Sequence, residues 1–376
     1  MNENSFFNSQ LFKDAREQVA AIIDQSQQQH INIFGQPWYK KHFTVSPFPR
    51  VASEFSAILE GVHAAPAAST INTHSERPIR SIDGFGSVKL EMMTAAHTYK
   101  LEAEDLRAMA DMKRLYEGRQ DYQSILNYVV DKLLNVRTRA IDGIIGNIDL
   151  RVLTALSNKG VFTFTQDNDP NSPFVGQSLS FGFDDSHAAT ANTAWTAGNK
   201  ATVNVLEDLM AINEASDVTL TKMLMRKEVL MYMLTTDKLK LYVNGSDYAS
   251  RPISINDVNT FFAQYGLPAI ELVEREVRVD KDGGKTQSKI QPWNKNTILF
   301  VPDDNFGTIE HRITDYDDSL ASEGVTYSKY EGIELQNWTT GIKEGSNYTE
   351  YTSAEFTYAP VISSIRNMYS LDVQLG

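Results

Sequence analysis

The most regular pattern in the chain is a long row of apolar residues that recur every three or four positions. The row consists of Ile125, Val129, Leu133, Val136, Ala140, Ile144, Ile148, Val152 and Leu156. This spacing places them on one face of an α-helix. It predicts a single helix over residues 120–157, about 55 Å long at a rise of about 1.5 Å per residue. A helix of that length is expected to form the backbone of its domain.

The remaining positions of this helix refine the prediction. Its polar face is expected to carry Asp131, Lys132, Arg137, Arg139, Asp142 and Asp149. Because glycine lowers helix stability, Gly143 and Gly146 are expected to mark a bend or the close approach of another segment. Gly160 follows the last apolar position and is expected to cap the helix C-terminus.

The residues before the hairpin region predict an extended arm over residues 1–60. A short helix fits Leu11–Ile23, and a Gln-rich run follows it. Pro37, Pro47 and Pro49 then interrupt an apolar and aromatic stretch and prevent a regular helix there. The apolar residues of such an arm need a surface to lie on, either the body of the same chain or that of a neighbour.

Two strand-like runs, residues 68–73 and 88–92, are separated by the turn-prone segment Asp83–Gly86. They predict a long hairpin within residues 61–101. An isolated two-stranded hairpin is only marginally stable in water, so this one is expected to lie against something larger. An ordinary hairpin within a sheet fits the pattern equally well.

The part of the chain after the long helix mixes short helices with short strands. Helices fit residues 203–215, 226–234 and 254–265, and strands fit residues 161–165, 178–183, 220–225, 270–278, 297–301 and 356–373. These elements do not alternate as βαβ units, and the chain has no internal repeat. The pattern therefore predicts the α+β class.

Composition and charge exclude several classes of protein. The absence of cysteine excludes disulfides, thiolate nucleophiles and Cys-based metal sites, and it fits a protein matured in a reducing cytoplasm. The formal net charge of -13 arises in residues 161–376, which hold 17 basic and 30 acidic residues, whereas residues 1–160 hold 18 of each. So acidic a chain is expected to bind nucleic acid only weakly and non-specifically. Neither a secretory signal nor a membrane span is expected.

Three local motifs resemble functional sites, but each lacks an essential residue. Residues 279–286 resemble a phosphate-binding loop with Val279 in place of glycine, and a hairpin turn at Asp282 explains them better. Residues 167–178 resemble a calcium loop in which Ser172 and Ser178 replace the glycine and the bidentate acid. The segment that begins at Gly176 lacks the second glycine of a nucleophile elbow.

The titratable residues form no catalytic constellation either. The histidines are His30, His42, His63, His74, His97, His187 and His311, and none stands at metal-ligand spacing from another. The acidic pairs Asp184-Asp185, Asp303-Asp304 and Asp317-Asp318 lie in turn-like segments, where aspartate bonds its own backbone. We therefore predict no catalytic, cofactor-binding or metal-ligating residue, no cofactor and no enzymatic activity.

Several local patterns acquire meaning from their order along the chain. They are Tyr99–Leu106, Leu156–Val161, Trp195 before Val203–Leu209, Thr221–Met225, Gly266–Pro268, Phe300–Asp303 and Tyr358–Pro360. Together with the order of arm, hairpin, long helix and mixed domain, they resemble the major capsid proteins of tailed bacteriophages. These proteins have the fold first described for phage Hong Kong 97, and the resemblance is strongest to the branch that contains the lambda shell protein.

The resemblance implies a domain organisation. Residues 1–60 would form the N-terminal arm, residues 61–101 the hairpin called the E-loop, and residues 102–218 the peripheral domain with the spine helix at about 120–157. Residues 219–354 would form the axial domain, and residues 355–376 a final strand that returns to the peripheral domain. The E-loop and the arm would lie across neighbouring subunits.

The resemblance also implies a function. Copies of the chain would assemble as hexamers and pentamers into an icosahedral shell that encloses double-stranded DNA in the virion, after synthesis in the cytoplasm of the host bacterium. A separate scaffolding protein and a portal are expected partners, and a decoration protein is left open. Lys89 lies in the hairpin, but nothing identifies a crosslinking partner, so no crosslink is expected. An encapsulin-like cellular cage and an enzyme with a phosphate or metal site are the alternatives.

Overall fold

In a computed structural model of the chain, the described residues form two compact units. The described residues are 36–59, 86–102, 104, 107, 111, 122–246, 251–281, 286–315, 322, 324–341 and 348–376. The first unit draws on Met1–Glu54, Glu91–Ile148 and Ile309–Pro360, and the second on Phe55–Leu90, Asp149–Thr308 and Val361–Gly376. The helix predicted over Leu11–Ile23 and the strand predicted over 68–73 lie outside the described residues.

The predicted long helix is confirmed as α5 (Tyr122–Ser157), which supplies residues to both units. Within its described side chains, the predicted apolar face is buried at Ala140, Ile144 and Ile148 in the first unit. The chain then leaves the helix through Gly160, whose φ of +68° is favoured in glycine and whose N–H donates to the carbonyl of Ala155 at 2.8 Å. This is the predicted cap.

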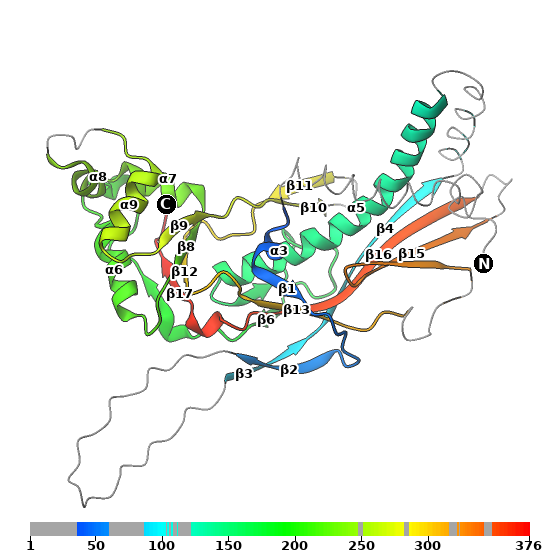
Figure 1. Cartoon of the computed structure of the whole chain (residues 1–376), viewed down its shortest axis with the longest axis horizontal. Coiled ribbons are helices and arrows are strands. Elements are labelled where there is room, and N and C mark those ends of the chain that lie inside the picture. Colours follow the sequence, from blue (N-terminus) through cyan, green and yellow to red (C-terminus); the bar gives the residue numbers. More distant parts are fainter. Residues whose placement is uncertain are drawn as a thin grey trace, which may run out of the picture. The chain divides into compact units, whose positions relative to one another are not determined.

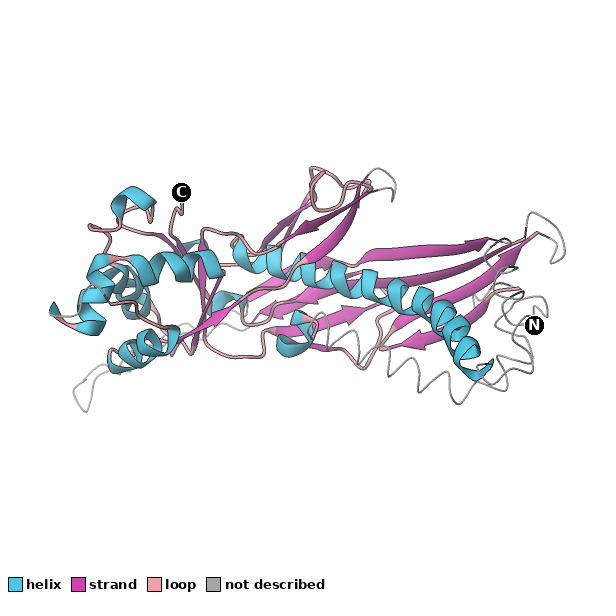
Figure 2. Ribbon diagram, turned by 90° about the horizontal axis from the view of Figure 1, so that it is seen from above, coloured by secondary structure: helices cyan, strands magenta, loops and turns pink. Residues whose placement is uncertain are grey.

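The first unit contains a sheet in the order β1-β13-β16-β15-β14, with β4 paired to β16. Its helix and strands are α3 (Trp38–His42), β1 (Phe43–Val45), β4 (Met93–Glu102), β13 (Gly307–His311), β14 (Thr326–Tyr330), β15 (Ile333–Thr340) and β16 (Thr349–Val361). Strand β16 pairs antiparallel with β4 over ten positions and with β15 over seven. The first part of α5 runs along this sheet (Figure 2).

Alternate residues of β16 explain how the sheet and the helix pack in the first unit. Thr352, Ala354, Phe356 and Tyr358 are buried, whereas the residues between them are less so. The Tyr358 hydroxyl contacts the side-chain oxygen of Asn147 on α5 at 2.8 Å. Helix and sheet lie close together at Gly143, where an added Cβ would lie 2.3 Å from Nδ1 of His97 on β4. Gly143 therefore marks a close approach, as its place in the helix predicted.

The second unit is built on a five-stranded sheet in the order β7-β17-β12-β8-β9, with four helices around it (Figure 1). The strands are β7 (Ala188–Thr190), β8 (Lys222–Met225), β9 (Ala269–Leu272), β12 (Thr297–Val301) and β17 (Tyr369–Asp372), and the helices are α6 (Val205–Ala215), α7 (Lys227–Thr235), α8 (Asp237–Asn244) and α9 (Ile255–Gln264). Every residue of the central strand β12 is buried. The core around it contains Trp195, Met223, Phe262 and Phe300.

Smaller elements complete the second unit. Three two-stranded sheets pair β2 (Glu54–Leu59) with β3 (Gly86–Glu91), β5 (Val161–Thr163) with β6 (Ser178–Ser180), and β10 (Val277–Lys281) with β11 (Thr286–Ile290). Short 3₁₀ helices are η2 (Asp185–His187), η3 (Ala197–Asn199) and η6 (Ile365–Asn367). The predicted helices near 203–215, 226–234 and 254–265 are confirmed as α6, α7 and α9, and Ser254 caps α9 reciprocally with Asp257.

Five sequence-based predictions need correction. Residues 270–278 form parts of two strands, β9 and β10, because the chain leaves the sheet at Val273. Residues 356–373 are likewise divided between β16 and β17 by η6. Residues 93–101, assigned to the hairpin, belong to β4, which pairs with β16. Strand β2 begins in residues assigned to the arm and pairs with β3. Strands β1, β7, β13, β14 and β15 and helix α8 were not predicted. The prediction that the prolines prevent a regular helix in the arm is wrong at α3 (Trp38–His42), because Pro37 stands at the N-cap of this helix, where its missing N–H costs nothing.

Asp149 is also misplaced by the sequence pattern, because it is fully buried instead of lying on an exposed polar face. Its carboxylate pairs with the guanidinium of Arg275 at 2.7 Å in the second unit. Burying a carboxylate is costly unless it is paired and hydrogen-bonded. The partner lies 126 residues further along the chain, so local periodicity could not reveal it.

Replacement of Gly143 by alanine should destabilise the first unit, although alanine favours a helix by about 1 kcal/mol. The added methyl group would overlap the ring of His97, and overpacking of this kind costs about 1–3 kcal/mol. Thermal unfolding followed by circular dichroism should show a lower midpoint for Gly143→Ala. Gly198→Ala, which adds a methyl group where no atom lies within 4 Å, is the control and should leave the midpoint unchanged.

Replacement of Arg275 by leucine should destabilise the second unit by about 3–5 kcal/mol, because it leaves the Asp149 carboxylate buried without its cation. The double variant Asp149→Leu/Arg275→Leu should recover at least half of that loss in urea unfolding. Arg278→Leu changes an exposed arginine on β10 and serves as the control. If Arg275→Leu and Arg278→Leu lower the free energy of unfolding equally, the buried ion pair contributes no more to stability than an exposed arginine does.

Candidate assembly surfaces

None of the motifs that resemble chemical sites forms one among the described residues. The strands on either side of Asp282 pair antiparallel, with Lys281 opposite Thr286, as expected for a hairpin, and the predicted turn itself lies outside the described residues. In the loop that resembles a calcium site, the Asn168 side chain instead accepts from the backbone N–H of Thr165 at 2.8 Å. Ser178 lies in a strand and bonds the Thr163 hydroxyl at 2.8 Å, where no strand-to-helix turn is present.

The described histidines are separate from one another and have packing partners. His42 lies 4.4 Å from the ring of Trp38, His187 stacks on Tyr369 at 4.0 Å, and His97 lies against Gly143. His311 has one ring nitrogen 3.0 Å from the carbonyl of Ser46. His30, His63 and His74 lie outside the described residues. Among the residues that the structure describes, no group of three potential ligands could hold a metal ion.

The acidic pairs lie in turns, as predicted for those that are described. Asp184 accepts from the backbone N–H of Ser186 at 2.9 Å. The hydrogen bonds from the side chain and the backbone of Ser186 lower the pKa of the Asp184 carboxyl. Asp304 pairs with Lys222. The pair Asp317-Asp318 lies outside the described residues. In the described part of the chain, no helix is long and apolar enough to span a membrane.

The surfaces that remain unexplained are exposed apolar ones, and one lies on the ribbon formed by β2 and β3. One face of β2 is buried in the second unit through Ala57 and Leu59. Leu59 lies so close to Gly182 that a Cβ there would stand 2.6 Å from its Cδ1. On the opposite face of the same strand Ile58 is 68% exposed. The ribbon is thus anchored on one side and carries a large apolar side chain into solvent on the other.

The first unit has its own exposed apolar residues in the segment that follows β1. Phe48 and Val51 are 79% and 77% exposed. Phe48 stands between Pro47 and Pro49, which prevent helix here. Arg50 is nevertheless held in place. Its backbone N–H donates to the backbone carbonyl of His311 at 2.8 Å, and its guanidinium pairs with the carboxylate of Glu310 at 2.6 Å. An ordered backbone therefore holds both apolar side chains in solvent.

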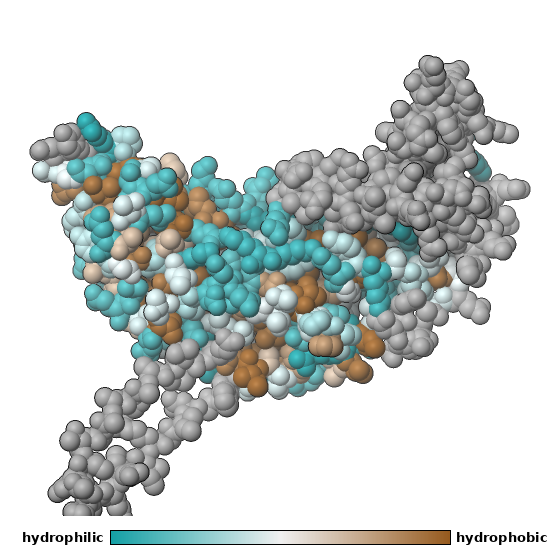
Figure 3. All heavy atoms as spheres, in the orientation of Figure 1, coloured by the Kyte–Doolittle hydropathy of each residue, from teal (hydrophilic) through white to brown (hydrophobic). Residues whose placement is uncertain are grey.

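A third apolar surface lies on the helices of the second unit. Tyr242 on α8 stacks on Phe261 of α9 with ring centroids 6.5 Å apart, and Phe261 contacts Tyr265 at 4.9 Å. Tyr242 and Tyr265 are both nearly half exposed. Figure 3 shows hydrophobic residues gathered over α8 and α9 at the upper left. We call Tyr242, Phe261 and Tyr265 the aromatic ledge.

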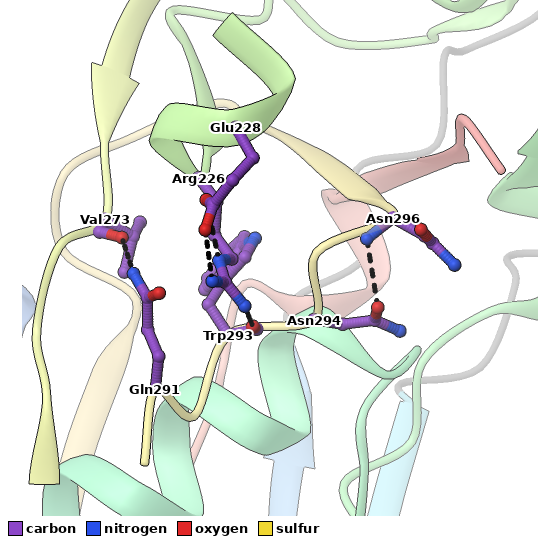
Figure 4. A network of polar contacts seen from close by, with 7 residues as sticks. All are labelled: Arg226, Glu228, Val273, Gln291, Trp293, Asn294 and Asn296. Carbon is purple, nitrogen blue, oxygen red and sulfur yellow. Dashed lines mark hydrogen bonds and ion pairs between the residues drawn. The ribbon is translucent and has the colours of Figure 1, made fainter. Parts of the chain in front are cut away.

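A polar network lies within the second unit (Figure 4). The Arg226 guanidinium binds both oxygens of Glu228 and also donates to the carbonyl of Trp293 at 3.4 Å. The segment after Trp293 is tied to the end of α5, because the N–H of Asn294 donates to the Ser157 hydroxyl at 3.0 Å. The Thr297 hydroxyl donates to the Ser157 carbonyl at 2.8 Å. These bonds fix the last turn of α5 to strand β12.

Trp195, noted in the sequence, is fully buried and bonds an acidic residue of α6. Its indole N–H donates to Asp208 at 2.9 Å, and the other oxygen of Asp208 accepts from the side chain of Asn192 at 3.0 Å. The buried carboxylate is thereby satisfied. This bond ties Trp195 to α6.

Comparison with known proteins agrees with this structural interpretation. Residues 159–336 match the model of the family described as phage major capsid protein E. No curated protein matches the chain.

Two solved structures with a similar fold are described as phage proteins. A capsid protein assigned to a prophage of E. coli CFT073 is 11% identical, with 77% of this chain and 79% of that chain covered and a TM-score of 0.50. The satellite phage P4 procapsid that includes the size determination protein gives 12% identity, 96% and 98% coverage and a TM-score of 0.45. The first of these structures shows that the mixed helix and sheet fold is one found in a phage capsid protein, and residues 159–336 are similar to the phage major capsid protein E family.

Proposed function

We propose that the chain is the major capsid protein of a tailed bacteriophage and that its copies assemble as hexamers and pentamers into an icosahedral shell around double-stranded DNA. The observation that carries this proposal is the anchored ribbon. Ile58 is 68% exposed on an ordered strand whose other face is buried. A single subunit gains nothing from this arrangement, whereas a neighbouring subunit could cover the apolar side chain.

The proposal assigns roles to segments of the chain. The ribbon is the base of the E-loop, which we extend to begin at β2, and the segment around Phe48 is part of the arm. Each would lie on another copy, so that apolar residues exposed in one subunit become buried in the shell. Many weak contacts of this kind make a closed shell stable. The second unit contains most of the proposed axial domain.

The charge of the chain supports the proposed relation to DNA. The net charge of -13 disfavours tight binding to phosphate groups, which a shell that later releases its DNA must avoid. We propose a separate scaffolding protein and a portal as partners, with a decoration protein left open. A capsid protein of this family and fold is structural, and we propose no enzymatic role and no crosslink through Lys89. The particles would form in the host cytoplasm and become part of the virion.

Expression of the full chain, alone and with its scaffolding protein, followed by electron microscopy, tests the proposal. Rings, sheets or closed particles support it, and a protein that stays monomeric under both conditions contradicts it. The contents of the particles distinguish a phage shell from the alternative, an encapsulin-like cage. A cage would enclose a protein cargo encoded nearby, whereas the phage gene would neighbour those for terminase and portal. A monomer that turns over a nucleotide would favour the enzyme alternative.

Ile58→Asp should prevent assembly without disturbing the subunit, because the side chain is exposed in the single chain. Burying an isoleucine stabilises a contact by about 1.5–3 kcal/mol per copy, and a charge at that position would reverse the sign. Particle yield in sedimentation should fall at least about tenfold, while the circular dichroism spectrum stays unchanged. Ile58→Val is the matched control and should assemble. If Ile58→Asp forms normal particles, the ribbon is not part of the contact between copies.

A further inference from the structure

Two acidic side chains lie directly opposite each other in the centre of the first unit's sheet. Glu334 on β15 is the register partner of Glu355 on β16. The same row continues to Lys329 on β14 and to Ala96 on β4. Paired residues of neighbouring strands point to the same face, with Cβ atoms about 5 Å apart. Like charges in this arrangement destabilise the pairing of the strands.

Burial makes this pair more costly than a surface pair would be. Glu334 is only 4% exposed, and Glu355 is partly buried. Glu334 accepts a hydrogen bond from the Gln336 amide at 2.6 Å, which holds its carboxylate in place. Glu355 lacks a comparable fixed donor among the hydrogen bonds of the described residues. Glu355 is therefore the member of the pair whose charge is harder to accommodate.

Among the described residues, the charged groups that act on Glu355 are of both signs, with two negative groups and one positive. Asp315 and Glu334 repel its negative charge, and Arg312 attracts it. Arg312 is positioned by its backbone N–H, which donates to Thr357 at 2.9 Å, but its side chain is exposed to solvent. Lys329 lies across from Glu334 and is also exposed. Solvent screens both cations, whereas the two glutamates face each other at close range.

We propose that Glu334 and Glu355 form a proton-sensitive lock in this sheet. When Glu355 carries a proton, it can lie beside the Glu334 carboxylate and β15 and β16 are held together firmly. When both carboxyls are ionised, their repulsion weakens the same pairing. The strands then remain paired through their backbone hydrogen bonds and through the apolar face packed on α5.

The direction of the pH dependence follows from the geometry. Burial, then Asp315 and Glu334, raise the pKa of the Glu355 carboxyl above its ordinary value of 4.5. The folded state therefore binds this proton more tightly than the unfolded state does. The stability of the first unit should rise as the pH falls through the raised pKa, and this gain should be complete below the ordinary value. Near neutral pH the ionised pair costs stability.

Glu355→Gln tests the lock, because glutamine resembles the protonated carboxyl. In the full chain, the thermal midpoint of Glu355→Gln should exceed that of the parent at pH 7.5 by about 2 °C, and the difference should vanish at pH 4. Hydrogen exchange of peptides covering β15 and β16, corrected for the intrinsic effect of pH, should slow at pH 7.5 in the same variant. An equal or lower midpoint at pH 7.5, with the acid dependence of the parent retained, overturns the proposal.

Two further variants keep the test decisive. Glu214→Gln removes an exposed carboxyl on α6 in the second unit and should shift neither the midpoint nor its pH dependence. Arg312→Gln removes the attracting cation, so it should lower the midpoint at pH 7.5 and steepen the gain on acidification. If Glu355→Gln does not fold, the outcome for Arg312→Gln decides. A pH profile for Arg312→Gln identical to that of the parent then contradicts the lock.

Discussion

The packing of one long helix against partners distant in sequence is the constraint on which the rest of the structure depends. In the first unit, α5 packs against a sheet so closely that residue 143 has no room for a side chain. In the second unit, the last turns of α5 bury Asp149, whose charge Arg275 neutralises. The end of the helix is bonded to β12 through Ser157. Each contact brings a different part of the chain to the helix. These contacts therefore determine which elements pack around it.

Features that depend on local pattern were predictable from the sequence. Helix α5 was located to within two residues because its apolar repeat extends over ten turns, and α9 because Ser254 and Asp257 cap it reciprocally. Features that depend on distant partners were not. Strand β4 has a sequence that suits a hairpin as well as a sheet, and only its pairing with β16 decides between them. Strands β14 and β15 are too polar to stand out from loops.

Prediction of the candidate assembly surfaces from the sequence is limited in the same way. Sequence patterns predict that the loop motifs around Asp282 and Ser178 are not sites of chemistry, because an absent residue type is visible in the sequence. They could not identify Ile58 or Tyr242 as exposed, since apolar residues on a surface and in a core have the same letters. The structure shows their exposure directly, because Ile58 is 68% exposed and Tyr242 is 43% exposed.

The interleaving of the two units has a consequence for synthesis on the ribosome. Strand β4 pairs with β16, and Glu102 can pair only after Thr349 has been synthesised. Strand β7 pairs with β17, and Ala188 can pair only after Ser370 has been synthesised. Neither sheet can be completed while the intervening residues are still inside the exit tunnel. Contacts this distant slow folding, because long loops must close before any pairing is gained. Nascent chains therefore keep β4 and β7 unpaired until β16 and β17 have left the ribosome.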